Sequence, residues 1–368
     1  MSAPVGVGVV GTGVISEEYL RNLTAFPDLR VLAVADLDPA RAAERAARHG
    51  VPRSSTVDDL LADPDIAIVV NLTVPAAHVD VSLAAIEAGK HVWVEKPLGL
   101  DLRGARALLD RAAQRGLRVA CAPDTLLGAG WQTARRAVDA GRIGEPRTAL
   151  ALFQTPGPEG WHSAPEFLFQ AGGGPLLDMG PYYLTGLVHL LGPIRRVTAT
   201  GSRARDTRVI GSGPRAGIEF EVTVPTTVSA LVEFERGGSA QAVFSFDSAL
   251  SRTGFLEVAG TLGTAVLPDP NRFDGTTALH LFDGGQTLAP QGHHATRGTG
   301  VLELARAIRA GEPERASGEL AYHVLDAMLA VEGSIALGRS VDVVSTVEPP
   351  PTLPVDWDPH AVFSPAAR

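Results

Sequence analysis

Short hydrophobic runs alternate with stretches of helical periodicity over the first third of the chain. The runs predict buried strands at Val5–Val10, Val31–Ala35, Ile66–Val70, His91–Val94 and Leu117–Cys121. The stretches between them predict helices at Ser16–Ala25, Pro39–His49, Ala76–Ala88 and Leu102–Arg115. Continuous apolar strands separated by helices indicate a parallel sheet that is covered on both faces. We therefore expect a doubly wound α/β domain over residues 1–122.

The pattern changes after residue 122. Beyond a predicted helix at Trp131–Ala140, strand-like runs follow one another without helices between them, at Ala149–Phe153, Val197–Gly201, Ile218–Val224, Val228–Phe234, Gln241–Phe246, Leu256–Gly260 and Leu279–Phe282. Helical periodicity returns at Val301–Ala310 and Glu319–Leu337. This order predicts a C-terminal α+β domain over residues 123–368, with a large, open and mostly antiparallel sheet.

Composition narrows the class of protein. The chain has 368 residues, of which 45% are hydrophobic, and a formal net charge of -9. An acidic chain repels phosphate backbones, so we expect no nucleic acid partner. Cys121 is the single cysteine, which rules out an intrachain disulfide. No apolar run reaches the roughly 18 residues of a membrane span, and the start lacks a basic region, so we expect no membrane partner and a cytoplasmic protein.

A glycine-rich turn follows the first predicted strand. Its residues are Gly11, Thr12, Gly13, Val14, Ile15 and Ser16. Glycines at its first and third positions allow a tight turn and a close approach of the backbone to a pyrophosphate. The helix that opens at Ser16 would supply N–H donors and a partial positive charge to that anion. The strand–turn–helix context makes this a candidate dinucleotide-binding turn.

The end of the second strand carries the residue that distinguishes the two nicotinamide cofactors. Asp36 lies 36 − 13 = 23 residues after Gly13, close to the roughly 20 expected for a carboxylate that binds the adenosine ribose. Such a carboxylate repels a 2′-phosphate, and Leu37 stands where a phosphate-binding arginine would fit. These residues favour NAD over NADP. Arg41, one helical turn away, leaves NADP open.

A lysine and several further sequence segments lie near the ends of the predicted strands. Lys96 lies in Glu95-Lys96-Pro97 after the predicted strand His91–Val94, at the edge where ligands bind in parallel sheets. Together with the glycine turn and Asp36, several segments make the chain resemble the glucose–fructose oxidoreductase/inositol dehydrogenase/MocA family over nearly its whole length. These segments are Asn71-Leu-Thr-Val-Pro75 with His78, Glu95-Lys-Pro97, Gly172-Gly-Gly with Asp178 and Gly180, and Arg297-Gly298.

The resemblance implies an N-terminal Rossmann domain and reversible hydride transfer between NAD and a secondary hydroxyl, usually of a sugar or cyclitol. It implies cofactor contacts by Thr73, Val74, Pro75, His78, Glu95 and Lys96, beside those of the turn at Gly11–Ile15 and of Asp36 and Leu37. It further implies a homodimer or homotetramer formed through the C-terminal sheet. In such proteins the peptide before the motif proline can be cis, which we expect for Lys96-Pro97.

The stretch after Gly172–Gly174 combines helical periodicity with Asp178 and Tyr182. Pro181 favours a helix that begins near Leu177–Gly180, because proline is tolerated in a first turn. Residues four apart then share a face. The family pattern has a histidine where this chain has Tyr182 and a later aspartate where it has Thr185. We expect the glycine run to let the backbone pass close to the nicotinamide.

Lys96, Asp178 and Tyr182 are the candidate catalytic residues. Alcohol oxidation needs a base that takes the hydroxyl proton. Tyr182 can serve as that acid/base if the cationic Lys96 lowers its pKa, with Asp178 orienting a substrate hydroxyl. In the alternative division Lys96 is the immediate proton partner and Asp178 tunes it. A purely structural interpretation, with Asp178 as a helix cap and Tyr182 as a packing residue, also fits the sequence.

Other candidates concern the substrate and its chemistry. Trp161 and His162, in a loop rich in glycine and proline, are candidate substrate-binding residues because an aromatic ring stacks on a sugar face. A structural role as anchors of that loop fits them equally well. His189 is expected to be a helix histidine with satisfied ring nitrogens. The pair His293-His294 lacks further spaced ligands, so we expect no metal.

Two other functions stay open: an enzyme whose tightly bound NAD supports epimerisation, elimination or glycoside cleavage, and a non-catalytic NAD(H) sensor.

Overall fold

The computed structural model describes residues 3–363, and this part of the chain forms two compact units. The first unit comprises the chain up to Ala129, Gly292–Tyr322 and the chain from Leu353 onward. The second unit comprises Gly130–Gln291 and His323–Thr352. The chain therefore crosses between the units four times, whereas the sequence predicted one boundary after residue 122.

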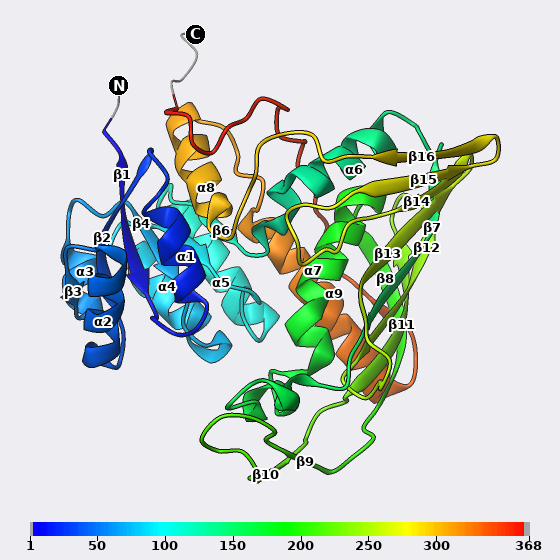
Figure 1. Ribbon diagram of the computed structural model, residues 1–368, viewed down its shortest axis with the longest axis horizontal. Helices are drawn as coiled ribbons and strands as arrows, with labels where there is room; N and C mark the ends of the chain where they lie inside the picture. The colour runs from blue at the N-terminus through cyan, green and yellow to red at the C-terminus, as the bar shows by residue number, and fades with distance from the viewer. Residues whose placement is uncertain (1–2, 364–368) are drawn as a thin grey trace. The chain divides into compact units, whose positions relative to one another are not determined.

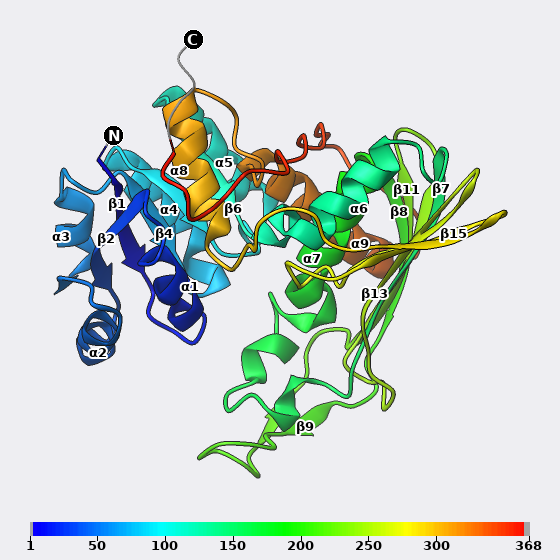
Figure 2. The same cartoon turned by 45° about the horizontal axis from the view of Figure 1, so that its top comes forward.

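The first unit contains a six-stranded parallel sheet with the order β3-β2-β1-β4-β5-β6. Its strands are β1 (Val5–Val10), β2 (Leu29–Ala35), β3 (Ser54–Ser55), β4 (Ile68–Asn71), β5 (His91–Val94) and β6 (Val119–Cys121). The helices on its two faces are α1 (Ser16–Leu23), α2 (Pro39–His49), α3 (Val57–Ala62), α4 (His78–Glu87), α5 (Leu102–Gln114) and α8 (Thr299–Ala310) (Figures 1 and 2). The short helices η1 (Pro75–Ala77) and η2 (Asp124–Leu127) follow β4 and β6. The strand order reverses between β1 and β4, which is the point where ligands bind in open α/β sheets.

Hydrophobic strands explain this core. Val7, Val9, Ile68 and Val70 have no exposed surface, because a parallel sheet covered on both faces buries every side chain of its central strands. α8 was predicted within the second domain but belongs to the first unit. The segment that follows α8 is held in the first unit by the edge strand β6, because the N–H of Cys121 donates to the carbonyl of Ala316 at 2.9 Å.

The second unit contains a nine-stranded sheet with the order β16-β15-β14-β13-β7-β12-β11-β8-β17. These strands are β7 (Pro146–Gln154), β8 (Ile194–Ser202), β11 (Thr227–Phe234), β12 (Ser239–Ser245), β13 (Arg252–Gly260), β14 (Gly263–Val266), β15 (Thr277–Leu281), β16 (Gly284–Leu288) and β17 (Val341–Asp342). All neighbours are antiparallel except β7 and β12. The predicted fold class, with a parallel N-terminal sheet and a large, mostly antiparallel C-terminal sheet, is therefore confirmed.

Helices cover one face of the nine-stranded sheet. They are α6 (Ala129–Asp139), α7 (Gly174–Leu191) and α9 (Gly318–Leu337), and α7 packs on β7, β11 and β12 (Figure 1). A separate two-stranded ribbon, β9 (Thr207–Val209) with β10 (Glu219–Glu221), and the short helices η3 (Pro158–Gly160) and η4 (Glu166–Phe169) complete the unit. By length and composition alone α9 could cross a membrane, but 56% of its most apolar window is buried within the protein, as in a core helix.

Candidate functional site

The glycine turn after β1 has the geometry that the sequence predicted. Gly11 has a φ of 96°, and a Cβ there would lie 2.6 Å from the main-chain carbon of Leu72, so only glycine fits. A Cβ on Gly13 would meet no protein atom within 4 Å. Gly13 is therefore not required by packing within the protein, and its missing side chain leaves space for a ligand that approaches the backbone.

The start of α1 provides the matching electrostatics. The hydroxyl of Ser16 donates to the carbonyl of Gly13 at 2.7 Å and closes the turn, so the small buried residue fits the third position of the motif. α1 begins at Ser16 without a side-chain cap. Its first N–H groups and the positive end of its dipole therefore suit a phosphate. The turn fits the pyrophosphate of a dinucleotide in shape and in charge.

Asp36 is held at the end of β2 by a set of hydrogen bonds. Its Oδ2 accepts from the N–H of Thr12 at 2.6 Å and from the Thr12 hydroxyl at 2.8 Å. Its Oδ1 accepts from the N–H of Asp38 at 2.9 Å and from Arg41 at 2.5 Å. Burial by itself would raise the pKa of Asp36, but the hydrogen bonds from Asp38, Thr12 and Arg41 outweigh it and lower the pKa to about 2. Asp36 is thus an anion at any physiological pH.

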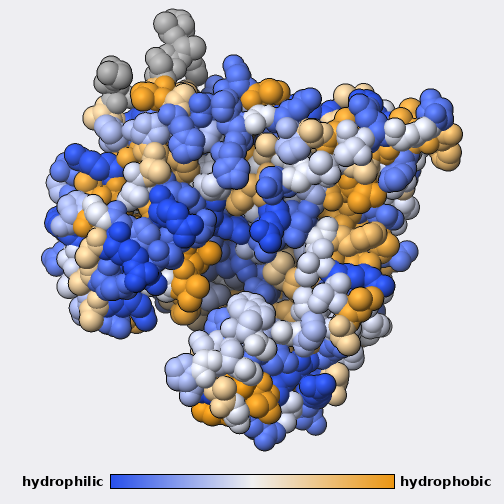
Figure 3. All heavy atoms as spheres, in the orientation of Figure 1, coloured by the Kyte–Doolittle hydropathy of each residue, from blue (hydrophilic) through white to orange (hydrophobic). Residues whose placement is uncertain are grey.

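Exposed aliphatic side chains surround this edge of the first sheet. Leu37 is 100% exposed, Val14 is 87% exposed and Val74 is 66% exposed. Figure 3 shows a hydrophobic group among hydrophilic side chains of the first unit, in the region where Figure 1 draws the turn between β1 and α1. Large apolar side chains with so much free surface suit contact with flat rings of a ligand.

Asn71 and His78 hold the loop after β4. The Asn71 amide oxygen accepts from the Thr73 hydroxyl at 2.6 Å, and its nitrogen donates to the His78 carbonyl at 3.0 Å. The His78 ring lies between two carbonyl oxygens, that of Pro97 2.7 Å from Nδ1 and that of Thr73 3.0 Å from Nε2. Burial lowers the pKa of His78 despite these two acceptors. His78 therefore braces the loop of Thr73–Pro75 against the turn at Pro97.

The turn at Lys96 is fixed by its neighbours. The carboxylate of Glu95 accepts the N–H of Lys96 at 2.9 Å and the hydroxyl of Tyr19 at 2.8 Å. The Lys96-Pro97 peptide is cis, as predicted. All predicted cofactor contacts, from Gly11 to Lys96, belong to the first unit, at the carboxyl ends of its strands.

α7 in the second unit carries Asp178 and Tyr182, but it begins earlier than predicted. It starts at Gly174, its N-cap is Gly173, and Pro181 lies inside it. Pro175 takes the first-turn position that was predicted for Pro181. Asp178 is therefore a residue of the helix body and not its cap, which excludes the structural interpretation of Asp178 as an N-cap.

Asp178 and Tyr182 are one helical step of four residues apart and share a face of α7. Asp178 is half-buried and Tyr182 is buried. The glycine run has a reason within the second unit, because a Cβ on Gly173 would lie 2.2 Å from the carbonyl oxygen of Phe167, and Gly172 and Gly174 have φ of 87° and 88°. Close packing and backbone conformation thus require these glycines without any approach to a cofactor.

Trp161 and His162 form an aromatic group in the second unit. The Trp161 and His162 rings lie 5.6 Å apart between centroids, and His162 lies 5.5 Å from Phe167. Trp161 is 72% exposed, whereas the loop beneath it is fixed by the buried Arg208, which donates to the carbonyl of Pro156 at 2.9 Å and pairs with Glu159. An exposed aromatic face on a rigid loop suits stacking on a sugar ring.

His189 differs from the prediction of satisfied ring nitrogens. It is completely buried in α7, and neither ring nitrogen has a hydrogen-bond partner among the described residues. Burial, followed by the charge of Arg135, lowers its pKa to about 3. His189 is therefore a neutral packing residue.

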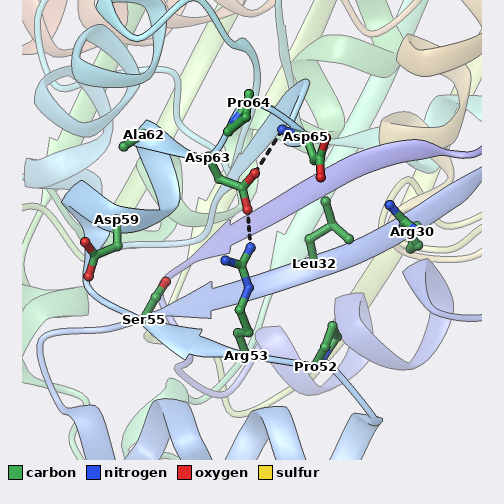
Figure 4. Close-up of a pocket in the computed structure, with 10 residues that line it drawn as sticks. All are labelled: Arg30, Leu32, Pro52, Arg53, Ser55, Asp59, Ala62, Asp63, Pro64 and Asp65. Atoms are coloured by element: carbon green, nitrogen blue, oxygen red, sulfur yellow. Dashed lines mark hydrogen bonds and ion pairs between the residues drawn. The ribbon is translucent and has the colours of Figure 1, made fainter.

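A hollow of about 820 Å³ lies elsewhere in the first unit (Figure 4). Its lining comes from the start of β2, from the chain around β3 and from the loop before β4, and includes Arg30, Arg53, Asp59, Asp63 and Asp65. In Figure 4 Arg53 reaches across to Asp63, with which it forms an ion pair. Its lining includes neither the glycine turn nor Asp36, so it is not the predicted cofactor site. Over residues 3–363 no group of three or more potential metal-ligating side chains is present.

Two buried polar residues near Lys96, Tyr19 and Asp124, were not predicted from the sequence. Tyr19 lies within the predicted helix Ser16–Ala25, and its hydroxyl gave no signal of its own. Asp124 accepts the N–H groups of Gly298 and Gly300 at 2.7 and 3.2 Å and lies 3.5 Å from Arg297. Its position directly after the predicted strand Leu117–Cys121 was the available signal, because polar residues at such ends line ligand sites.

Comparison with known proteins identifies the class. Residues 5–122 match a family model described as oxidoreductase family, NAD-binding Rossmann fold, and residues 131–266 match the GFO/IDH/MocA C-terminal domain. The chain therefore belongs to the GFO/IDH/MocA oxidoreductase family, as the sequence predicted, and its first unit is an NAD-binding Rossmann domain.

Individual relatives cover most of the chain. It is 28% identical to 1,5-anhydro-D-fructose reductase of Ensifer adhaerens over 345 residues. This aligned region covers 91% of this chain and 98% of that protein. It is 31% identical to trans-1,2-dihydrobenzene-1,2-diol dehydrogenase of Oryctolagus cuniculus over 71% of this chain and 75% of that one. Levoglucosan dehydrogenase, in complex with NADH and L-sorbose, superposes with a TM-score of 0.81 at 22% identity, over 94% of this chain and 100% of that chain, which shows the shared fold.

Proposed function

We propose that the enzyme transfers hydride between NAD and a secondary hydroxyl or ketone of a sugar, cyclitol or related polyol. The observation that carries this proposal is the turn at Lys96, which follows a parallel strand at its ligand-binding end and belongs to the same unit as the glycine turn and Asp36. The names of the relatives, a reductase of an anhydrosugar ketone and a dehydrogenase of a vicinal diol, support this substrate class.

The chain's own residues take separate parts in this proposal. When bound, the nicotinamide accepts or returns the hydride. The cationic side chain of Lys96 polarises the substrate oxygen, so that negative charge developing on it is stabilised. Tyr182 exchanges the hydroxyl proton and Asp178 accepts a hydrogen bond from a substrate hydroxyl. Trp161 stacks on the apolar face of the ring and His162 contacts its hydroxyls.

Asp36 makes NAD the preferred cofactor in this proposal. Its carboxylate is ionised and fixed, so it can accept the hydrogen bonds of the adenosine ribose and repels a 2′-phosphate. Leu37 and Val14 would cover the flat rings, and the turn at Gly11–Ile15 would hold the pyrophosphate.

Nicotinamide absorbance tests the proposal directly. The purified protein is mixed with NAD or NADP and a panel of sugars, anhydrosugars and cyclitols, and each mixture is also analysed for altered carbohydrate. Absorbance that rises with NAD and one substrate class would support the proposal. A flat trace with isomerised or cleaved carbohydrate would replace it with a reaction that recycles bound NAD. A flat trace with unchanged carbohydrate over the whole panel would contradict it.

We also propose that two copies associate through the face of the nine-stranded sheet that no helix within residues 3–363 covers. Leu231 of β11 is 43% exposed there. It pairs with Gln241 of β12, which in turn pairs with Leu150 of β7. Val243 and Leu152 form a second row on the same face. Such apolar rows on an open sheet favour a self-complementary interface. Leu231→Glu should shift the mass measured by light scattering toward the monomer, whereas an unchanged mass would contradict this interface.

We further propose a cytoplasmic location. The chain has a single cysteine, Cys121, which is buried, and burial raises the pKa of its thiol well above the ordinary value. A fold that does without disulfides suits a reducing compartment, where NAD-linked metabolism also takes place. Microscopy of a fluorescently tagged chain tests this location, and export from the cell would contradict it.

A further inference from the structure

A buried hydrogen-bonded chain connects α1 with the turn at Lys96. The indole N–H of Trp93 donates to the hydroxyl of Tyr19 at 3.0 Å, and that hydroxyl donates to Oε1 of Glu95 at 2.8 Å. Oε2 of Glu95 accepts the N–H of Lys96 at 2.9 Å. Trp93 and Tyr19 have no exposed surface and Glu95 is 8% exposed. These hydrogen bonds are therefore shielded from water, and each one joins a defined donor to a defined acceptor.

Simple packing does not require these polar groups. A phenylalanine would fill the place of the Tyr19 ring, and an apolar side chain that of Glu95, without burying a hydroxyl and a carboxylate together. Burial, together with the negative charges of Glu95 and Asp124, raises the pKa of Tyr19 well above its ordinary value. Tyr19 thus stays protonated and acts as a permanent hydrogen-bond donor, which excludes it as a proton carrier.

The contacts on either side of Lys96 indicate the role of this hydrogen-bonded network. Glu95 fixes the N–H of Lys96, while His78 of α4 contacts the carbonyl of Pro97 at 2.7 Å from the other side. We propose that Tyr19 is a positioning residue for Lys96 and acts through Glu95, an inference that rests on the catalytic part proposed above for Lys96. Because Tyr19 lies in the helix that begins at the glycine turn, it links the cofactor-binding turn to the catalytic lysine.

Other ionisable groups face the same carboxylate. His78 comes from α4, Cys121 from β6 and Asp124 from η2, and Arg297 precedes α8 and lies 3.5 Å from Asp124. Burial raises the pKa of Asp124 and of Cys121 and lowers that of His78. The Glu95 carboxylate accepts the main-chain N–H of Lys96 directly, so a change in the charge of Glu95 should reach Lys96.

The amino acid composition makes Lys96 easy to observe. The chain has two lysines, Lys90 and Lys96. Lys90 is buried and donates to the carbonyl of Asp63 at 2.6 Å. Trace acetylation at a series of pH values, followed by mass spectrometry of the peptides, therefore reports the titration of Lys96 without any assay of turnover.

Two substitutions should move that titration in opposite directions. Tyr19→Phe removes a donor that partly neutralises Glu95, so the titration midpoint of Lys96 should rise by about half a pH unit or more. Glu95→Gln removes the negative charge, so the midpoint should fall by a similar amount. In Tyr19→Phe we also expect kcat to fall about tenfold while the KM for NAD changes less than twofold.

Tyr183→Phe is the matched control. Tyr183 is a fully buried tyrosine of the second unit, and its hydroxyl accepts the N–H of Gly254 at 2.7 Å. This variant should lose stability and leave the Lys96 midpoint unchanged. Unshifted midpoints in folded Tyr19→Phe and Glu95→Gln would overturn the inference. If Tyr19→Phe does not fold, Glu95→Gln decides alone. Wild-type protein without turnover would overturn the proposed function, while the Lys96 titration still decides the role of Tyr19.

Discussion

The carboxylate of Asp36 accepts two hydrogen bonds from Thr12, one from its main-chain N–H at 2.6 Å and one from its hydroxyl at 2.8 Å. Thr12 stands between the two glycines of the turn after β1, and Asp36 ends the neighbouring strand β2. Asp36, the proposed determinant of cofactor preference, is therefore fixed to the turn that would bind the pyrophosphate. Its orientation is set before any cofactor arrives.

Replacing Asp36 should change the cofactor preference. In Asp36→Ser the fixed anion is gone and the guanidinium of Arg41, now 2.5 Å from Oδ1, is free to pair with a 2′-phosphate. We expect the ratio of kcat/KM for NADP to that for NAD to rise about 10- to 100-fold. Asp38→Ala is the control, because Asp38 caps α2. It should lower stability by about 1 kcal/mol and leave the ratio unchanged. An unchanged ratio in Asp36→Ser would show that Asp36 does not select the cofactor.

Removing the side chain of Lys96 should separate catalysis from cofactor binding. We expect Lys96→Ala to lose at least about a hundredfold in kcat, because the cation that polarises the substrate oxygen is missing. Affinity for NAD, measured by fluorescence titration, should change by less than about threefold. Lys90→Met removes the other lysine, which bonds to Asp63, and should cost stability without loss of turnover. Full activity of Lys96→Ala would contradict the proposed mechanism.

Asp178 and Tyr182 can be distinguished by their kinetic signatures. Tyr182→Phe should lower kcat about 10²- to 10⁴-fold and remove one limb of the pH profile, as expected for loss of a general acid/base. Asp178→Asn should mainly raise the KM for substrate, because it weakens a hydrogen bond formed in the ground state. Tyr183→Phe, at the next position of α7, should keep its activity. A pH profile that persists in Tyr182→Phe would leave Lys96 as the immediate proton partner.

Arg208 should control both the stability of the protein and the conformation of the loop at Pro156–Glu159. Its side chain is 3% exposed and pairs with Glu159 and Asp247. Arg208→Met leaves two carboxylates without their cation, so we expect a loss of roughly 3–5 kcal/mol in the free energy of unfolding. The KM for substrate should rise and that for NAD should not, because the loop at Pro156–Glu159 leads into Trp161. Adding Glu159→Gln and Asp247→Asn should restore part of the stability. No recovery would contradict this ion-pair explanation.

The accuracy of the sequence-based predictions follows the strength of the local pattern. β1, β5 and α2 have the predicted bounds, because each is an uninterrupted apolar run or a strongly amphipathic helix between clear turn residues. β14 and β16 were overlooked since their apolar side chains are few: Ala265 and Val266 in β14, and Leu288 in β16. The start of α7 was misplaced because one proline, Pro175, already satisfied the first-turn rule, and a second one was tolerated inside the helix.

Long-range contacts set the limit of what sequence could show about the site. The glycine turn, Asp36 and Lys96 were predicted because each stands at a fixed offset from a strand. Tyr19 lies 76 residues from Glu95, and no local pattern connects the two. The return of α8 to the first unit likewise involves long-range pairings, such as the hydrogen bond between Cys121 and Ala316. Such pairings become visible only when the backbone has been placed.

His189 should make the protein acid-sensitive. Its pKa is about 3 in the folded chain, against about 6.5 for an unfolded one, so the unfolded chain binds more protons between these values. Stability should therefore fall as pH drops below about 6.5, by up to roughly 1.4 kcal/mol per pH unit. His189→Leu keeps the volume in α7 and removes the titrating group. We expect its Tm to equal or exceed that of wild type at pH 7.5 and to fall less at pH 5.

His323→Leu is the matched control for this prediction, since His323 is equally buried but uses both ring nitrogens. Nε2 accepts the N–H of Ile194 at 2.9 Å and Nδ1 lies 2.9 Å from the Ser345 hydroxyl. Its replacement should lower the Tm at pH 7.5, because it leaves a buried N–H without an acceptor. If His189→Leu instead lost as much stability at pH 7.5 as His323→Leu, the His189 ring would have polar partners, and the acid sensitivity would need another cause.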